Sequence, residues 1–144
     1  MVEAAVSPVH EEPLHVVQGA TFDFEFRWHL GAFNTTTQLW ELGAARPVGH
    51  MTARLQVRKS LKTPVLLDAT SQNGLILLGA GTAANDPETG RIRFLWPGVE
   101  TMKVNVVKSI YDFELYDATE TPLRTYQLIR GPVDCTLNVT RESL

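Results

Sequence analysis

The sequence contains few of the residues that build disulfide-linked, metal-bound or nucleic-acid-binding proteins. Its one cysteine, Cys135, excludes an internal disulfide framework and any metal site made of several cysteines. Lysine and arginine number 13 against 16 acidic residues, and they form no basic run. Because contacts to phosphate need clustered positive charge, we expect no nucleic-acid partner.

Long apolar runs are missing as well. The longest, residues 75–80, is far too short to cross a bilayer, so we expect no membrane partner. Residues 1–12 have neither the basic segment nor the apolar core of a secretory signal peptide. We therefore expect a protein that is made in the cytosol and is exported, if at all, as part of an assembled particle.

The composition is that of one globular domain. The chain has 144 residues, of which 44% are hydrophobic and 20% are charged. A chain of this length can bury enough apolar surface to fold without a disulfide or a metal. The dominant pattern is an alternation of apolar and polar residues, clearest from Phe22 to Leu30. A period of two is typical of a β-strand with one buried face.

Alternation and short apolar runs predict about eight strands with turn residues between them, which favours an all-β, antiparallel sandwich. Asn73-Gly74 predicts a turn, Pro97-Gly98 ends a strand before a single helical turn at 98–103, and Gly131-Pro132 predicts a break. The predicted strands are residues 22–30, 51–58, 65–68, 75–78, 91–96, 109–116, 123–129 and 133–139.

Two segments lie outside this pattern. Residues 1–12 predict an extended N-terminal arm, which is either a frayed terminus or a segment that docks on a neighbouring subunit. The remaining residues, 13–144, form the single predicted domain. Within it, residues 31–50 are a long insertion, which either contacts a partner or folds back on the core as an extra hairpin.

No catalytic motif is present, and we predict no catalytic residue, no cofactor and no enzymatic activity. The four histidines, at positions 10, 15, 29 and 50, lack the close spacing of a metal site on a helix. Cys135 alternates with apolar residues, so we expect a buried and unreactive thiol. The sequence therefore predicts no metal site.

Two weaker patterns have a functional and a structural interpretation. Asp112 and Glu114 project from one strand face about 7 Å apart, a separation that suits a glycosidase but also any solvated strand. The aromatic row from Phe22 to Trp28 is interpreted as core packing, because a sugar-binding platform would have to be exposed. A sugar-binding protein would likewise expose Trp40 and Trp96.

Several structural motifs occur in a familiar order. They are residues 18–22 (QGATF), 52–60 (TARLQVRKS), 64–68 (PVLLD), 73–74 (NG), 90–92 (GRI), 111–115 (YDFEL), 131–133 (GPV) and 139–141 (VTR). Over residues 13–141 this order resembles a family of small proteins and modules from tailed bacteriophages. These are immunoglobulin-like β-sandwiches similar to the N-terminal module of baseplate upper proteins. A short turn joins the first two strands in that family, so the insertion at 31–50 departs from it.

The resemblance implies a non-enzymatic structural protein of the virion, made in the host cytoplasm and located in the tail or baseplate. It would attach fibres or peripheral proteins, with other virion proteins as partners in a symmetric multi-copy assembly. The alternatives are a capsid decoration or head-fibre protein, a carbohydrate-binding module for host-surface contact, or an enzyme. The residues expected at a partner interface are Val2, Val6, Val9, His10, Leu39, Trp40 and Leu42.

Overall fold

The computed structural model describes residues 10–138, with the backbone alone at Gly31 and Trp40. In this range the regular structure is almost entirely strand, and no helix reaches the length and apolarity that a bilayer span needs. The strands are β1 His10–Glu11, β2 Leu14–Val17, β3 Phe22–Arg27, β4 His29–Asn34, β5 Leu39–Ala45, β6 Thr52–Arg58, β7 Val65–Thr70, β8 Ile76–Leu78, β9 Arg91–Trp96, β10 Lys108–Asp117, β11 Arg124–Tyr126 and β12 Ile129–Thr136, with one helical turn, α2 Gly98–Thr101.

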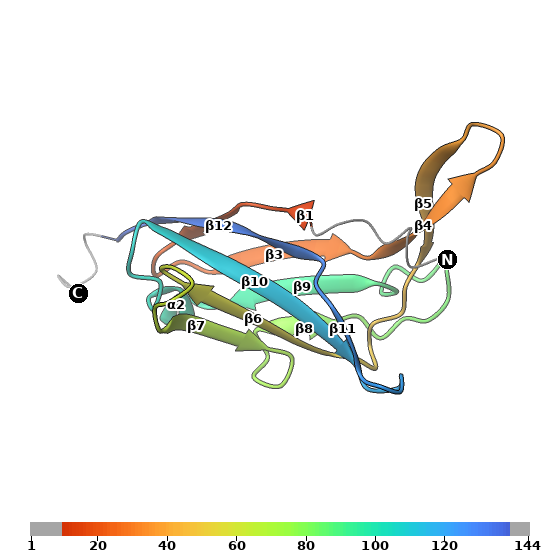
Figure 1. Ribbon diagram of the computed structural model, residues 1–144. Coiled ribbons are helices and arrows are strands. Elements are labelled where there is room, and N and C mark those ends of the chain that lie inside the picture. The colour runs from red at the N-terminus through yellow and green to blue at the C-terminus, as the bar shows by residue number, and fades with distance from the viewer. Residues whose placement is uncertain (1–9, 139–144) are drawn as a thin grey trace.

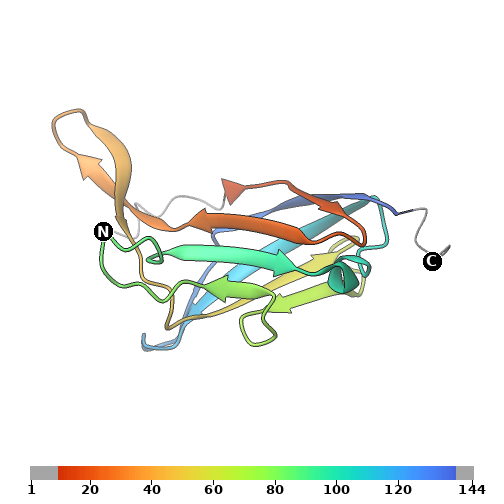
Figure 2. The same cartoon turned by 180° about the vertical axis from the view of Figure 1, so that it is seen from behind.

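Two sheets pack face to face. The larger has the order β12-β10-β6-β7, with β1 and β2 paired to the outer side of β12 and β11 paired to β10. The smaller has the order β3-β9-β8. Figure 1 looks onto the larger sheet and Figure 2 onto the smaller one. In immunoglobulin terms, β3, β9 and β8 are strands B, E and D, and β12, β10, β6 and β7 are G, F, C and C′. The predicted all-β sandwich is therefore confirmed.

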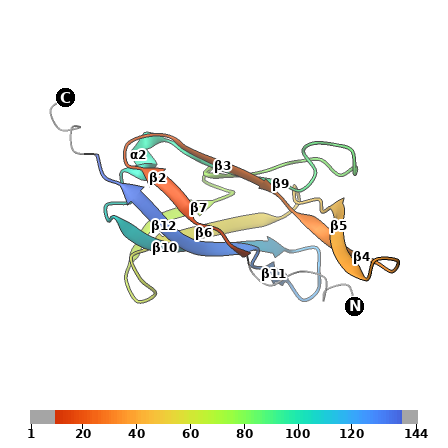
Figure 3. The same cartoon turned by 90° about the horizontal axis from the view of Figure 1, so that it is seen from above.

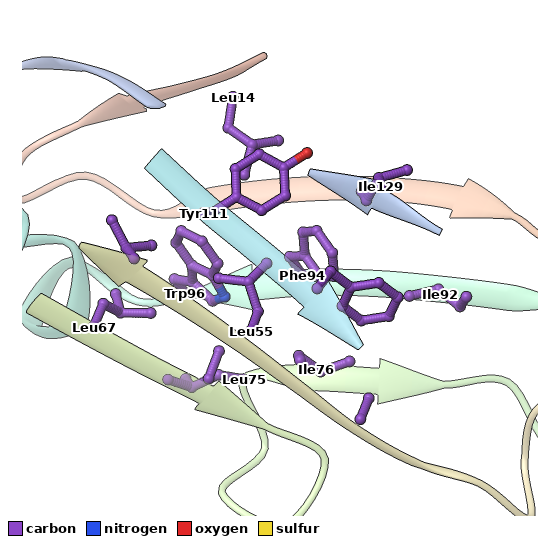
Figure 4. Packing of buried hydrophobic residues seen from close by; sticks show 14 of the residues in the cluster. Leu14, Leu55, Leu67, Leu75, Ile76, Ile92, Phe94, Trp96, Tyr111 and Ile129 are labelled. Atoms are coloured by element: carbon purple, nitrogen blue, oxygen red, sulfur yellow. The ribbon is translucent and has the colours of Figure 1, made fainter. Parts of the chain in front are cut away.

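The alternation in the sequence decides which side of each strand is buried. In β6, Leu55 and Val57 point into the core while Arg54 and Gln56 lie on the outer face. The same alternation along β9 and β10 supplies the two facing layers of apolar side chains. Figure 4 shows these side chains meeting between the sheets. The predicted helical turn is also confirmed, as α2.

Aromatic rings connect the two sheets. Phe113 on β10 contacts Phe26 on β3 and Phe94 on β9, with ring centroids 5.9 and 5.3 Å apart. Phe22 packs 4.7 Å from the fully buried ring of Trp96. The aromatic row of β3 is core packing, as predicted. Antibody domains join strands B and F by a disulfide, whereas here the ring contact between Phe26 and Phe113 spans the same two strands.

The N-terminal strands complete one edge of the larger sheet. Both run parallel to β12, β1 along its start and β2 along its second half. In the short segment that joins β1 to β2, the Glu12 carbonyl accepts a hydrogen bond from the Tyr111 hydroxyl at 2.6 Å. His10 and Glu11, at the end of the predicted arm, thus belong to the sandwich as β1, while residues 1–9 lie outside the described range.

Strand β12 runs through the break predicted at Gly131-Pro132, so that prediction is wrong. The Cys135 amide donates to Val107 on the β10 side of the strand, and amide directions alternate along a strand. The backbone nitrogen of Pro132 therefore points to the side of β1 and β2. It lies in the gap between the residues of β12 that pair with β1 and those that pair with β2. A proline there removes no ladder hydrogen bond, which is why the strand tolerates it.

The predicted strand 22–30 is wrong in its last three residues. It ends with β3 because the chain turns out of the β3–β9 ladder at Trp28: the Trp28 amide still donates in register to the Gly90 carbonyl at 2.8 Å, but the Trp28 carbonyl accepts from the Arg46 amide at 2.9 Å. Gly90 has φ +76°, and a Cβ there would lie 2.7 Å from the Trp28 carbonyl oxygen, so only glycine fits this junction. The chain then enters a separate two-stranded sheet, β4–β5.

The turn predicted at Asn73-Gly74 is confirmed, with Gly74 at φ +82°, and it carries the chain from β7 in the larger sheet to β8 in the smaller one. The predicted strand 123–129 is divided. Its first part is β11, which pairs with β10, and its last residue already belongs to β12.

Candidate attachment surface at the loop end

Three connections lie at the same end of the sandwich, which we call the loop end. They join β3 to β6, β8 to β9 and β10 to β12 (Figure 1). In immunoglobulin variable domains the B–C and F–G connections at this end carry the binding loops. Here the B–C connection carries β4 and β5, residues 29–45, which we call the hairpin. It projects from the body of the sandwich, away from the end that carries α2 (Figures 2 and 3).

The hairpin exposes large apolar side chains. Leu42 is 79% exposed, Leu39 63% and Phe33 43%. Among residues 29–45 the one acidic or basic side chain besides His29 is Glu41. Within the described residues, β4 and β5 pair with each other alone. Several exposed apolar side chains on a projecting element are more typical of an interaction site than of ordinary protein surface.

The tip of the hairpin is ordered by its own hydrogen bonds. The Asn34 side-chain oxygen accepts from the amides of Thr36 and Thr37, at 2.9 and 3.2 Å. The Gln38 amide donates to the Asn34 carbonyl at 2.7 Å, and Gln38 adopts φ +62°. An asparagine that bonds the following amides is a common way to fix a tight loop. The exposed leucines therefore lie on a strand, β5, that begins directly after a defined turn.

A cluster of side chains braces the base of the hairpin. The Arg46 guanidinium lies 5.0 Å from the ring centroids of both Trp28 and Tyr126. It donates to Asp117 at 3.1 Å, to Glu120 at 3.3 Å and to the Tyr126 hydroxyl at 3.3 Å. We call these five residues the bracing cluster. It joins the residue that follows the hairpin to the F–G connection, so both connections are held together.

Asp117 is the buried anion of this cluster, with its side chain 2% exposed. Burial alone would raise its pKa, but the Thr119 hydroxyl and amide both donate to it, at 2.5 and 3.0 Å, and His50 Nε2 lies 3.4 Å away. These contacts prevail and lower the pKa to about 2. The carboxylate is thus ionised and fully engaged, which suits a structural role and not proton transfer.

The structure describes four of the seven residues predicted at a partner interface. Leu39 and Leu42 both lie exposed on the hairpin, on opposite faces of β5, and His10 lies exposed on β1. Trp40 stands opposite Phe33 in the β4–β5 register. The other three predicted contacts, Val2, Val6 and Val9, lie outside the described residues.

Sequence reasoning missed the bracing cluster. Arg46 falls in the predicted insertion, and Asp117 and Glu120 fall in a predicted turn. Arg46 and Asp117 are 71 residues apart, and no local sequence pattern connects them. Their contact becomes apparent from the folded structure alone. Phe33 was missed as well, although it lies in a largely apolar segment in which Glu41 and His29 are the titratable side chains.

Two further titratable side chains, His29 and Cys135, have structural partners. His29 donates to the Gly43 carbonyl across the hairpin at 3.0 Å. Cys135 is buried, its thiol donates to the Val104 carbonyl at 3.4 Å, and burial raises its pKa. Across residues 10–138, no three histidine, cysteine or acidic side chains gather closely enough to hold a metal ion.

The two carboxylates considered for glycosidase chemistry lie on the outer face of the larger sheet. Asp112 accepts from the Gln127 amide at 3.0 Å, and Glu114 accepts from the Tyr116 hydroxyl. Both line a shallow hollow of about 170 Å³, which is smaller than the pockets that usually enclose a small-molecule substrate.

No protein-family model and no curated protein matches this chain.

Proposed function

We propose that this chain is a structural protein of a tailed-phage virion, an adaptor of the tail or baseplate that attaches fibres or peripheral proteins and has no enzymatic activity. The observation that carries the proposal is the hairpin, which projects from the loop end with Leu39 and Leu42 exposed. Burying such side chains against a neighbouring subunit stabilises an assembly through the hydrophobic effect.

The bracing cluster supports this role. A projecting two-stranded hairpin is only marginally stable by itself. Arg46, held by Trp28, Tyr126 and Asp117, fixes the base of the hairpin before any partner binds. An element that is already oriented loses less entropy on docking, which favours attachment.

The test is quantitative mass spectrometry of purified particles, counting this chain against the major capsid protein. A tail or baseplate adaptor gives about three to a few tens of copies, because tail symmetry is cyclic. Copies on the order of hundreds would place the chain on the capsid lattice and favour the decoration alternative. Its absence from the particle would refute both.

A matched pair of variants tests the hairpin itself. Leu42→Asp places a charge on the hairpin, whereas Val99→Asp places one on α2 at the opposite end, where the side chain is 71% exposed. Both variants should fold as the wild type does. We expect Leu42→Asp alone to lower the copy number per particle at least about tenfold. Equal incorporation of the two variants would remove the hairpin from the interface.

A further inference from the structure

The smaller sheet has an open edge at β3. Within the described residues, β3 pairs with β9 on one side and with no strand on the other (Figure 2). The Trp28 amide donates to Gly90, and in an antiparallel ladder the residues that bond to the neighbouring strand alternate. The amides and carbonyls of Asp23, Glu25 and Arg27 therefore point away from β9, and no backbone group of the described residues bonds to them.

The free edge of β7 in the larger sheet is different, because a side chain covers part of it. Asn73 Oδ1 accepts from the Thr70 amide at 3.0 Å, and Asn73 Nδ2 donates to the Asp68 carbonyl at 2.9 Å. At the other side of that sheet, Pro13 separates the short strands β1 and β2. Among the described strands of the two packed sheets, β3 therefore has the longest uninterrupted open edge.

Apolar surface is uncovered along this edge. Phe24 and Phe26 point into the core but stay partly exposed, whereas Phe94 and Ile92, which pair with them on β9, are fully buried. The difference arises because β9 has a strand on both sides and β3 lacks one. A strand added beside β3 would cover these rings and bond to the free amides and carbonyls.

The acidic side chains of β3 already have arginine partners within the sheet. Asp23 accepts two hydrogen bonds from Arg93, at 2.9 and 2.7 Å. Glu25 Oε1 accepts one from Arg91 at 2.9 Å, and Arg91 also donates to Glu88 at 2.7 Å. Because these carboxylates are neutralised within their own copy, their charge does not prevent a second strand from approaching the edge.

Arg27, at the other end of the edge, has no such partner. Its guanidinium donates to the Asp86 carbonyl at 2.8 Å, and no carboxylate of the described residues forms an ion pair with it. A second copy turned by a two-fold axis presents the same edge in the opposite direction. Arg27 of each copy then meets Asp23 of the other, and a carboxylate has enough lone pairs to accept from both Arg93 and this second arginine.

We propose that two copies of this chain pair through their β3 edges, antiparallel and centred on Glu25, so that the two three-stranded sheets become one. This register places Asp23 opposite the partner's Arg27 and uses every free backbone group of β3. On the inner side, Phe24 lies opposite the partner's Phe26, an aromatic pair that stabilises neighbouring strands. A shift by two residues would leave either Asp23 or Arg27 without a partner. This pairing does not depend on the attachment role of the hairpin.

Sedimentation velocity of the full chain over about 1–100 µM measures the association. We expect a dimer whose dissociation constant rises at least about tenfold for Arg27→Glu, because this variant sets two carboxylates opposite each other. Lys62→Glu makes the same change of charge in the exposed loop between β6 and β7, so it is the matched control and should dimerise as the wild type does.

A proline tests the backbone directly. The Glu25 amide takes no part in the β3–β9 ladder, so Glu25→Pro removes a hydrogen bond of the dimer and none of that ladder. Glu25→Gln is the matched control, because it also removes the charge that faces Arg91 but keeps the amide. We expect a monomer for the proline variant and a dimer for the glutamine variant. Near-ultraviolet circular dichroism checks that each variant is folded.

Residue-resolved hydrogen exchange of the wild type by NMR needs no variant. The amides of Phe24 and Phe26 bond to β9 and should be protected at every protein concentration. Those of Glu25 and Arg27 should gain protection only at concentrations where the dimer forms. Exchange at Glu25 and Arg27 that does not depend on concentration would contradict the pairing.

Three results in sedimentation would also overturn the proposal. The first is a wild-type monomer over the whole concentration range, and the second is an unchanged dimer for the folded Arg27→Glu and Glu25→Pro variants. The third is a dimer that Leu42→Asp disrupts while Arg27→Glu does not, since this would place the contact between copies on the hairpin. Loss of Leu42→Asp from the particle with an intact dimer would separate attachment from self-association and agree with both proposals.

Discussion

At the scale of single residues, Arg46 connects four side chains of the loop end, those of Trp28, Asp117, Glu120 and Tyr126. Its guanidinium stacks against Trp28 and Tyr126 and neutralises the buried Asp117. Removing one member of a buried pair leaves the other charge without a partner, so we expect Arg46→Ala to lower the free energy of unfolding by about 2–3 kcal/mol. Urea denaturation measures this change.

The ion pair between Arg54 and Asp68 on the surface provides the control for that measurement. Arg54 donates two hydrogen bonds to Asp68, but both side chains are about half exposed. Exposed ion pairs contribute little, so Arg54→Ala should cost less than about 1 kcal/mol. Equal losses for Arg46→Ala and Arg54→Ala would show that the bracing cluster contributes no more than an ordinary surface pair.

Asp117 gives the fold a dependence on acid. Its pKa is about 2 in the folded protein, below the 3.8 of an unperturbed aspartate. A depressed folded-state pKa means that the stabilisation is present above the unfolded value and is lost as the pH falls from about 4 through 2. Asp117→Asn should be less stable at pH 7 and should lose less stability over that acid range. Urea midpoints at several pH values measure the difference, and parallel curves for the two proteins would contradict it.

At the scale of elements, the hairpin should be the least protected of the larger strand pairs. It has two strands and pairs with no other strand among residues 10–138, whereas β6 and β10 lie inside the larger sheet. Amides of residues 30–44 should exchange with deuterium much faster than those of β10. Hydrogen-exchange mass spectrometry measures both segments, and Arg46→Ala should quicken exchange most in the hairpin and in the F–G connection, which the Arg46 side chain joins. Protection equal to that of β10 would show that the hairpin is stabilised by more than its base.

The alternation of apolar and polar residues predicted most of the sandwich, because a strand with one buried face has an apolar residue at every second position. It located β6, β9 and β10 and the buried side of each. It did not find the end of β3, since Trp28 continues the apolar pattern while its backbone bonds to Gly90 and Arg46. It also placed a break at Pro132, because tolerance of a proline depends on neighbouring strands that a local pattern does not contain.

The candidate site was predictable in part for the same reason. Leu39 and Leu42 stood out as apolar residues in a long insertion, and both are exposed on the hairpin. The contacts that orient the hairpin were not predictable, because Arg46 meets Asp117 and Tyr126 only after the B–C and F–G connections come together at the loop end.

At the scale of the whole molecule, ring contacts between the sheets carry much of the cohesion. Phe113 is fully buried and contacts rings of two strands in the other sheet. Phe113→Ala should lower the free energy of unfolding by about 3–5 kcal/mol, a large part of the total stability of a domain. Phe33→Ala on the exposed hairpin should change it by less than about 1 kcal/mol. Thermal and urea unfolding compare the two, and similar losses would contradict the assignment of Phe113 as the link between the sheets.

The position of β12 has a consequence for synthesis on the ribosome. This strand lies between β10 and the N-terminal strands β1 and β2, although it is the last strand of the described chain. The first strands therefore emerge without the neighbour they pair with, and must wait until residues 129–136 have been made. Until then β2 and the edge of β10 that faces β12 lack their backbone hydrogen-bond partners, and a nascent chain stalled before residue 129 should depend on chaperones and be open to proteases.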